Sequence, residues 1–281
     1  MEIITVTNKM NDCSRGWRAS GRKIALVPTM GFFHEGHLSL MRQAKTMADH
    51  VVVSLFVNPL QFGPSEDLAR YPRNLNQDVA LAEMCGVDVI FAPTVSEMYP
   101  EPPLTMVTVT SLSGRLCGVS RPEHFAGVCT VVNKLFNIVR PGVAVFGSKD
   151  FQQLAVIRRM NADLNMGVDI VAHPIVREND GLAMSSRNSY LSTAERGDAV
   201  CLCQAIGVAR GLVAGGEVEV AHLLDEVNKV IKVRENVRVD YAAIVDAVKL
   251  EPQVQIGRDS LLVMAVWVGG TRLIDNAMLM E

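Results

Sequence analysis

Two histidines three positions apart, His34 and His37, follow an apolar run near the start of the chain. Near the start of a helix, side chains at positions i and i+3 share a face. That helix start also offers unpaired N–H groups and a partial positive charge to a phosphate. Gly36 leaves room for a nucleotide close to the backbone, and the imidazoles can stabilise charge that develops on a phosphate during displacement. The spacing therefore predicts a nucleotide site, with two partly buried structural histidines or a metal site as alternatives.

Polar side chains also follow two other apolar runs. Asn58 and Gln61 come after residues 51–57, and Ser148, Lys149 and Asp150 come after residues 143–147. In an open α/β sheet, ligands bind beyond the carboxyl ends of the strands, so these side chains are expected to gather with the histidines. An ammonium group offsets phosphate charge, and the two amides suit a hydroxy acid or an amide-like group. A surface ion pair and an Asn-Pro turn are the respective alternatives.

A fourth polar segment, Met184-Ser185-Ser186-Arg187, follows an Asp-Gly turn signal. Its hydroxyls, N–H groups and guanidinium could clamp a phosphate, whereas a solvated loop with a helix cap is the alternative. Residues 142–149 approach the P-loop pattern, but that motif needs Lys directly after its second glycine, so this interpretation fails. The remaining histidines lack partners at metal-ligand spacing, and no metal bound by side chains is predicted.

Short β-branched runs alternate with helical patterns over the first 175 residues. The runs occupy residues 24–28, 51–57, 87–92, 143–147 and 168–172, and the helical patterns occupy residues 38–48, 74–85, 128–139 and 151–164. Apolar runs without alternation suit strands that are buried on both faces of a parallel sheet. Residues 1–175 are therefore predicted to form a doubly wound α/β domain, with residues 106–110 as a further extended segment.

The pattern changes after residue 192. Helical spacing covers residues 193–213 and 218–233, with two glycines as the break between them. Residues 239–245, 260–268 and 271–274 are typical of strands. Helices followed by neighbouring strands predict a smaller α+β domain. We place the boundary near residue 176, which gives domains of residues 1–175 and 176–281.

The composition is that of a globular protein with a sizeable core. Apolar residues make up 49% and charged residues 20% of 281 residues, with a formal net charge of −3. No cluster of Lys and Arg is available for nucleic-acid phosphates. No signal-peptide pattern is visible, and the apolar runs are too short to cross a membrane. Six scattered cysteines without metal spacing predict reduced thiols in a cytoplasmic protein.

Several segments, taken in order, resemble the pantothenate synthetase (pantoate–β-alanine ligase) family of the His-x-Gly-His nucleotidyltransferase superfamily. The shared motifs are Pro28-Thr29-Met30-Gly31, His34-x-Gly36-His37, Phe56-Val57-Asn58-Pro59-x-Gln61-Phe62, Tyr71-Pro72-Arg73, His124-Phe125, Lys149-Asp150-Phe151-Gln152-Gln153, and residues 180–188. The similarity runs from about residue 20 to 192, with a weaker match at residues 272–276. The resemblance implies a Rossmann-like N-terminal domain, a smaller C-terminal lid domain and a homodimer. It also implies ATP-dependent condensation of pantoate with β-alanine through a pantoyl adenylate, with release of pyrophosphate and AMP.

The same resemblance implies roles for individual residues. ATP contacts would come from Met30, Gly31, His34, Gly36, His37, Gly147, Ser148, Lys149, Asp150, Val176 through its backbone, Met184, Ser185, Ser186 and Arg187. Pantoate would be held by Gln61 and Gln153, with Asn58 as a further candidate, and Gln61 would also lie near β-alanine. His37 would be the proton donor, beside His34 and the Lys149 ammonium as stabilisers of phosphate charge. Any Mg²⁺ would be held mainly by the ATP phosphates.

Two positions depart from the family pattern. Ser148 stands where Glu is usual, and Ala126 stands where Arg is common. We expect altered contacts at the rim of the site rather than lost activity. A related nucleotidyltransferase that keeps the nucleotide in its product and a nucleotide-binding module without catalysis are the alternative functions. An aminoacyl-tRNA synthetase is disfavoured, because the chain has no basic surface pattern and no room for an anticodon domain.

Overall fold

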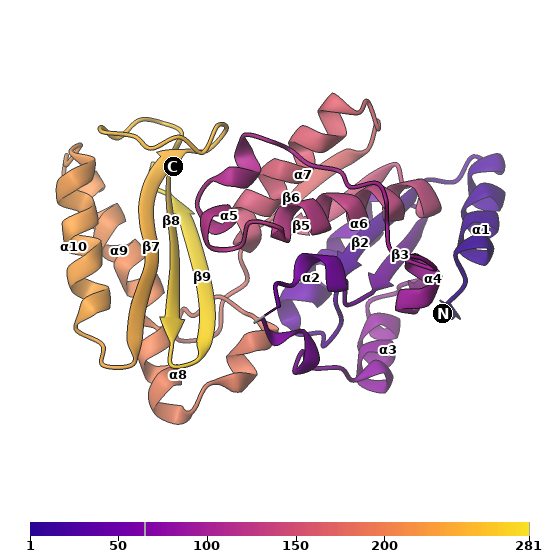
Figure 1. Cartoon of the computed structure of the whole chain (residues 1–281), viewed down its shortest axis with the longest axis horizontal. Coiled ribbons are helices and arrows are strands. Elements are labelled where there is room, and N and C mark those ends of the chain that lie inside the picture. The colour runs from indigo at the N-terminus through magenta and orange to yellow at the C-terminus, as the bar shows by residue number, and fades with distance from the viewer. Residues whose placement is uncertain (65, 281) are drawn as a thin grey trace. The chain divides into compact units, whose positions relative to one another are not determined.

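Apolar β-branched segments form a six-stranded sheet in the first part of the chain (Figure 1). Its strands are β1 (Glu2–Ile4), β2 (Ile24–Thr29), β3 (His50–Leu55), β4 (Val89–Phe91), β5 (Val143–Gly147) and β6 (Asp169–His173). Their spatial order is β1-β4-β3-β2-β5-β6, and every neighbouring pair is parallel. The computed structural model describes residues 1–64 and 66–280. The predicted parallel sheet is confirmed.

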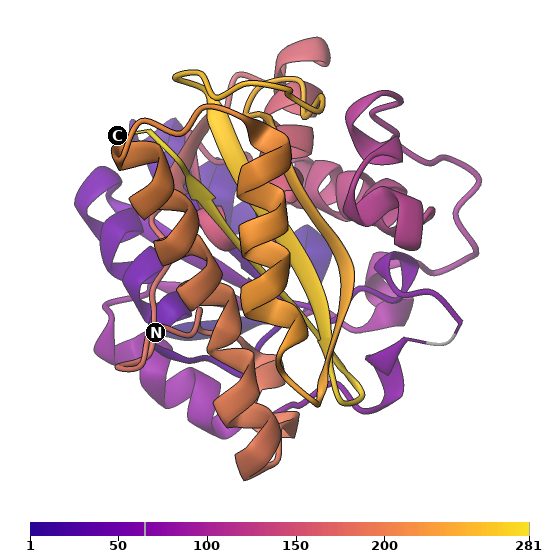
Figure 2. The same cartoon turned by 90° about the vertical axis from the view of Figure 1, so that its left-hand side faces the viewer.

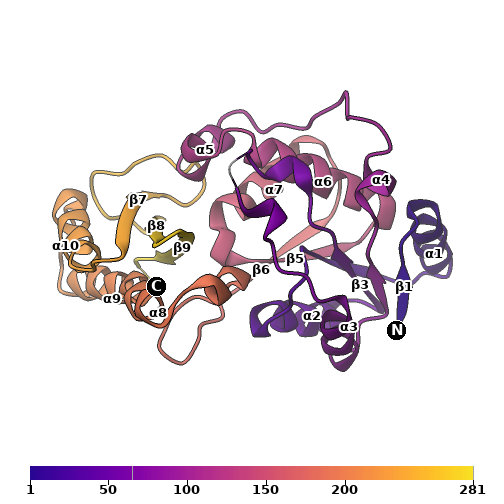
Figure 3. The same ribbon diagram turned by 60° about the horizontal axis from the view of Figure 1, so that its bottom comes forward.

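Helices cover both faces of this sheet (Figure 3). Helices α2 (Glu35–Met47) and α3 (Leu75–Met84) lie on one face, and α1 (Thr7–Ala19), α6 (His124–Val139) and α7 (Phe151–Asp163) lie on the other. Met41 and Ala44 of α2 pack with Val27 and Val53 of the strands. Right-handed crossovers between parallel strands produce this arrangement. The carboxyl ends of the strands therefore share one edge, where such sheets bind ligands.

A three-stranded antiparallel sheet forms the core of the C-terminal part. Strands β7 (Val237–Asp246), β8 (Ser260–Val268) and β9 (Thr271–Met278) pair in that order. Helices α9 (Cys201–Ala214) and α10 (Val220–Lys232), in orange in Figure 2, lie side by side against this sheet and follow α8 (Thr193–Ala199). Leu202, Leu223 and Val227 of the helices share a buried cluster with Leu262 and Met264 of β8. The predicted smaller α+β part is confirmed.

Short helices complete the element order. They are η1 (Pro59–Gln61), η2 (Asp67–Ala69), α4 (Val95–Met98), η3 (Leu112–Gly114), α5 (Cys117–Ser120), η4 (Ser148–Asp150) and η5 (Ser186–Tyr190). Three of them, η1, η4 and η5, contain or border predicted site residues. These site segments are short turns, and side-chain caps from Asn58 and Ser185 begin η1 and η5.

Backbone contacts divide the chain into two compact units. The first comprises residues 1–114, 121–148 and 153–174, and the second comprises residues 115–120, 149–152 and 175 onward. Two short segments of the first 175 residues thus group with the C-terminal part. Arg115 Nη2 donates to Glu251 at 3.0 Å and Ser120 Oγ donates to Asp240 at 3.1 Å, which explains the grouping of residues 115–120. The assignment of residues 1–175 as the substrate domain and 176–281 as a lid stays a prediction.

The sequence patterns missed β1 and α1 and misjudged two other segments. Strand β1 buries Ile4 alone, and α1 buries only Met10 and Ser14, so neither has a clear apolar period. Residues 106–110, predicted as a further extended segment, join no sheet; the Val107 N–H donates to the Thr130 hydroxyl at 3.0 Å instead of to a neighbouring strand. The helix expected over residues 193–213 is divided at residue 200 into α8 and α9.

The run Thr193–Ala214, which spans α8 and α9, is long and apolar enough to cross a membrane by length and composition. The core helix of a globular protein passes the same test. Leu202, Ala205, Ile206 and Ala209 are buried in the cluster formed with α10 and the three-stranded sheet. We therefore interpret this run as core helices.

All six cysteines are free thiols, and they differ in burial. Cys129 and Cys201 are fully buried, and burial raises the pKa of each thiol to about 11. Because the thiolate is the reactive form, both should resist iodoacetamide at about pH 8, while the partly exposed Cys13, Cys85 and Cys203 react first. Mass spectrometry of the labelled peptides measures this order, with protein unfolded in urea as the control. Equally fast labelling of Cys129 in folded protein would contradict the prediction.

Candidate active site

His34 and His37 cap the start of α2 reciprocally. The Gly36 N–H donates to His34 Nδ1 at 3.2 Å, and the His34 N–H donates to His37 Nδ1 at 3.4 Å. The two ring centroids lie 4.1 Å apart. Because both Nδ1 atoms accept hydrogen bonds, each neutral ring carries its proton on Nε2. The pair therefore has two Nε2 donors at a helix start, where the backbone already favours an anion.

A buried carboxylate shapes the turn that leads into this helix. Asp78 of α3 accepts from the N–H groups of Phe32 at 2.8 Å and Phe33 at 2.6 Å. Gly31 and Phe32 both have positive φ, 84° and 54°, and a Cβ on Gly31 would lie 3.0 Å from Asp78 Oδ2. Burial raises the pKa of Asp78, although the two N–H groups oppose this shift. Asp78 carries no signal in the sequence, because an acidic residue in the first turn of a helix is ordinary.

Asp78→Ala is expected to lower kcat by about 10²-fold, because the turn that carries His34 and His37 loses both acceptors and shifts. The free energy of unfolding should fall by about 1–3 kcal/mol, the cost of leaving buried donors unpaired. Asp78→Asn keeps one acceptor and should lose less of both. Steady-state kinetics and urea unfolding of the two variants measure these effects. A kcat for Asp78→Ala equal to that of the wild type would contradict this role.

The pH dependence of stability distinguishes the carboxyl group from the amide. Because the pKa of Asp78 is raised on folding, the folded protein binds this proton more tightly than the unfolded chain does. The resulting stabilisation is fully present below the unfolded pKa of about 3.9 and is lost as pH rises through the folded pKa. Urea unfolding at several pH values should therefore show that the wild type loses stability relative to Asp78→Asn across this window.

Asn58, which caps η1, and Gln61, its last residue, form one polar cluster with Met30. Asn58 Nδ2 donates to Gln61 Oε1 at 3.2 Å and to the Gly127 carbonyl at 3.1 Å, and Gln61 Nε2 contacts Met30 Sδ at 3.0 Å. The Tyr99 hydroxyl donates to Asn58 Oδ1 at 3.0 Å, and burial raises the pKa of Tyr99 to about 12, which keeps this donor protonated. Asn58 is only 1% exposed. Its contacts orient the Gln61 amide beside Met30.

The main chain of Gln61 has separate support. Its carbonyl accepts from Arg121 Nη2 at 3.2 Å and from His124 Nδ1 at 2.9 Å. Arg121 also forms a bidentate pair with Glu66, at 2.7 and 2.5 Å. Burial by itself would raise the pKa of Glu66, but the Arg121 guanidinium lowers it overall. The roles of these side chains could not be predicted from the sequence, since only the folded chain brings Arg121 and His124 to residue 61.

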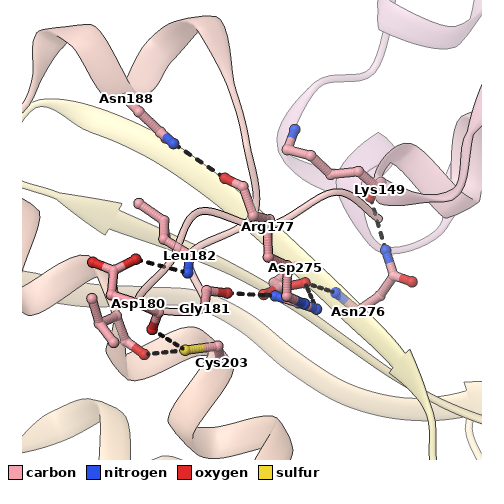
Figure 4. Close-up of polar contacts among 11 residues, drawn as sticks. Lys149, Arg177, Asp180, Gly181, Leu182, Asn188, Cys203, Asp275 and Asn276 are labelled. Atoms are coloured by element: carbon pink, nitrogen blue, oxygen red, sulfur yellow. Dashed lines mark hydrogen bonds and ion pairs between the residues drawn. The ribbon is translucent and has the colours of Figure 1, made fainter. Parts of the chain in front are cut away.

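The predicted site residues at the end of β5 and after it divide between the two units. Gly147, Ser148 and Gln153 group with the first unit, and Lys149 and Asp150 with the second. Lys149 Nζ lies 3.7 Å from Asp150 Oδ2. The Lys149 carbonyl accepts from Asn276 Nδ2 at 2.8 Å (Figure 4). Lys149 is thus tied through its main chain to β9.

The predicted phosphate-clamp segment lies in the second unit and is well ordered by local bonds. It comprises Met184, Ser185, Ser186 and Arg187, and Val176, the predicted backbone contact to ATP, lies in the same unit. The Met184 N–H donates to the Val176 carbonyl at 2.9 Å, and Ser185 Oγ accepts from the Arg187 N–H at 3.3 Å as the cap of η5. Asn188 Nδ2 donates to Ala183 O at 3.1 Å, which closes the loop. The segment is therefore a capped hairpin rather than an open loop.

The structure gathers the predicted residues into two groups. The first unit holds Met30, Gly31, His34, Gly36, His37, Asn58, Gln61, Gly147, Ser148 and Gln153, and the second holds Lys149, Asp150, Val176 and residues 184–187. Convergence of the two groups on one ATP stays a prediction. Within residues 1–64 and 66–280, no three His, Cys, Asp or Glu side chains form a group that could hold a metal.

The parallel sheet defines an open α/β fold, and the polar turns after its strands lie at the edge where such folds bind ligands. The family model described as pantoate-beta-alanine ligase matches residues 2–278. The pantothenate synthetase of Trichlorobacter lovleyi is 54% identical to this chain over 279 residues, which cover 99% of each chain. The pantothenate synthetase of Geobacter sulfurreducens is also 54% identical, over 281 residues, which cover 100% of this chain and 99% of that one. The chain therefore belongs to the pantoate–β-alanine ligase family.

Solved structures agree with this assignment. The crystal structure of pantothenate synthetase from Thermus thermophilus is similar at a TM-score of 0.95 and 42% identity, and the match covers 100% of both chains. Pantoate-beta-alanine ligase from Francisella tularensis, complexed with beta-gamma ATP and beta-alanine, matches at a TM-score of 0.82 and 30% identity over 99% of this chain and 98% of that one. The predicted fold class and family are confirmed.

Proposed function

We propose that this chain is an AMP-forming ligase that joins pantoate to β-alanine. Pantoate and ATP give pantoyl adenylate and pyrophosphate, and the amine of β-alanine then displaces AMP to give pantothenate. The observation that carries the proposal is the His34–His37 pair, whose Nδ1 atoms both accept backbone hydrogen bonds and whose Nε2 atoms therefore bear the protons. The match of residues 2–278 to the ligase family supports it.

The first step requires that the reactants be aligned and that the developing charge be stabilised, and it needs no covalent enzyme intermediate. The pantoate carboxylate is already a nucleophile, and it must lie in line with the α-phosphorus and the leaving pyrophosphate. The charge that develops on the phosphates would be stabilised by the Nε2–H donors of His37 and His34 and by the Lys149 ammonium. Gly31 and Gly36 would admit the nucleotide to the backbone at the start of α2.

The Gln61 amide is proposed to bind pantoate and, in the second step, to lie near β-alanine. Gln153, in the first turn of α7, is the second proposed pantoate ligand. Asn58 donates its amide N–H groups to Gln61 and to the Gly127 carbonyl, so we propose that its role is to orient the Gln61 side chain. The β-alanine amine attacks the carbonyl carbon of the mixed anhydride, AMP leaves, and the nitrogen loses a proton. Exclusion of water protects this anhydride from hydrolysis.

The remaining ATP contacts are proposed for Met30 after β2, for the end of β5 and the residues after it, and for the capped hairpin. They are Met30, Gly147, Ser148, Asp150, the backbone of Val176, and Met184, Ser185, Ser186 and Arg187. ATP would enter as its Mg²⁺ complex, with the ion held mainly by the phosphates. The C-terminal part would act as a lid over ATP, in a cytoplasmic homodimer that needs neither nucleic acid nor membrane.

Exchange of labelled pyrophosphate into ATP tests the first step. Exchange that requires pantoate, together with formation of AMP and pantothenate when β-alanine is added, is the expected result. A stable nucleotidyl product without AMP would identify a related nucleotidyltransferase instead. ATP binding without pantoate-dependent exchange would identify a nucleotide-binding module without catalysis, and either result would overturn the proposal.

A further inference from the structure

The segment Arg272–Asn276 of β9 contains two buried polar side chains and lies outside the proposed substrate contacts. Asp275 and Asn276 are 2% and 6% exposed. A buried carboxylate is costly unless it is paired and hydrogen-bonded. Neighbouring residues of a strand point to opposite faces, so these two side chains reach different surroundings. The pair therefore needs partners on both faces of β9.

Asp275 is paired with Arg177, at the start of the hairpin that leads to Ser185. Arg177 Nη1 and Nη2 donate to the two Asp275 carboxylate oxygens at 2.7 and 3.0 Å. Arg177 Nη1 also donates to the Gly181 carbonyl at 2.9 Å, at the tip of the hairpin. Figure 4 shows Arg177 between Gly181 and Asp275. A bidentate pair fixes orientation as well as distance, so the hairpin has a defined position on β9.

Asn276 extends this network to Lys149. The Asn276 N–H donates to Asp275 Oδ1 at 2.8 Å, and its Nδ2 donates to the Lys149 carbonyl at 2.8 Å (Figure 4). Arg177, Asp275 and Asn276 thus connect Lys149 with Gly181, which lies 32 positions later in the sequence. All of these residues belong to the second unit.

We propose that Arg177, Asp275 and Asn276 are positioning residues. They hold Lys149 and the hairpin that leads to residues 184–187 in one arrangement for binding the ATP phosphates. The inference rests on the proposed function, because that function gives Lys149 and the hairpin their common ligand. Arg177 acts through the hairpin, and Asn276 acts through the main chain of Lys149. Asp275 joins the two.

The closing experiment is a double-variant cycle on the full chain with two readouts, ATP affinity by calorimetry and pantoate-dependent pyrophosphate exchange. Asn276→Ala should weaken ATP binding about 10-fold, and Lys149→Ala about 10²-fold. If Asn276 acts through Lys149, the double variant should bind ATP no more than about 3-fold more weakly than Lys149→Ala alone. Multiplication of the two single effects to about 10³-fold would overturn the inference.

A matched control comes from the same sheet. Asp240 Oδ2 of β7 accepts from Arg272 Nε at 3.0 Å and Nη2 at 2.8 Å, which makes a second, partly buried arginine–aspartate pair. Asp275→Asn should lower exchange at least about 10-fold, whereas Asp240→Asn should leave it within about 3-fold of the wild type at a similar loss of stability. Equal losses of activity in the two variants would show a general structural role and overturn the inference.

The two hypotheses fail in different ways. A wild-type protein without pantoate-dependent exchange would reject the proposed function, while the ATP-affinity cycle would still decide whether Asn276 and Lys149 are coupled. A wild-type protein with exchange and independent effects of Asn276 and Lys149 would reject only the inference. If Asp275→Asn fails to fold in urea-unfolding controls, Asn276→Ala, which removes a single side-chain amide, still completes the cycle.

Discussion

Replacement of His37 by alanine is expected to lower kcat by about 10²–10³-fold, the usual effect of losing one preorganised donor to a developing anion. The imidazole Nδ1 accepts from the His34 N–H at 3.4 Å, so the neutral ring bears its proton on Nε2. Alanine removes this donor and also a helix cap, whose loss costs about 1 kcal/mol of stability. Steady-state kinetics with pantoate, ATP and β-alanine measures kcat.

Two further substitutions separate the cap from the donor. In His37→Asn, the side-chain oxygen can accept from the His34 N–H as Nδ1 does, but no donor reaches the position of Nε2. This variant should keep its stability and lose kcat as the alanine variant does. His37→Gln can place an amide N–H farther out and should recover part of the activity. His222→Asn is the control, because His222 of α10 pairs with Glu217, just before that helix, within the second unit. Activity near the wild-type level in His37→Asn would refute the assignment.

Gly127→Ala should cause the largest loss of stability of the substitutions considered. A Cβ at this position in α6 would lie 2.2 Å from the Leu60 carbonyl oxygen and 2.6 Å from the Gln61 nitrogen. Both neighbours are main-chain atoms, so no side-chain rotation relieves the overlap. We expect the free energy of unfolding to fall by about 3 kcal/mol or more. We also expect kcat/KM for pantoate to fall by about 10²-fold, because η1 must move away with Gln61.

Gly16→Ala supplies the matched control for this prediction. Gly16 lies within α1, and a Cβ there would meet no atom within 4 Å. Since glycine is less favourable than alanine inside a helix, Gly16→Ala should raise stability by about 0.5–1 kcal/mol without changing the kinetics. Urea unfolding of both variants, with pantoate titrations, measures the contrast. A stable Gly127→Ala protein with unchanged kcat/KM for pantoate would show that α6 and η1 are not closely packed.

Local sequence chemistry was enough to predict the parallel sheet, most of its helices and the turn that begins α2. Unbroken β-branched runs such as residues 51–57 indicate strands buried on both faces, because helices must cover both sides. His34 and His37 indicate a helix start, because residues at i and i+3 meet within one turn. These features depend on neighbours in the chain. The weakly apolar α1 and the three-residue β1 carry too little of this signal, and they were missed.

Only the tertiary structure decided how the candidate site is held. Asp78 meets the Phe32 N–H across 46 positions, and Arg177 meets Asp275 across 98. The restriction to glycine at position 127 likewise depends on the carbonyl of Leu60. No local propensity encodes such pairs, because each arises from the packing of elements that are remote in sequence. The sequence by itself determined which groups could do the chemistry, and packing decided which buried residues hold them in place.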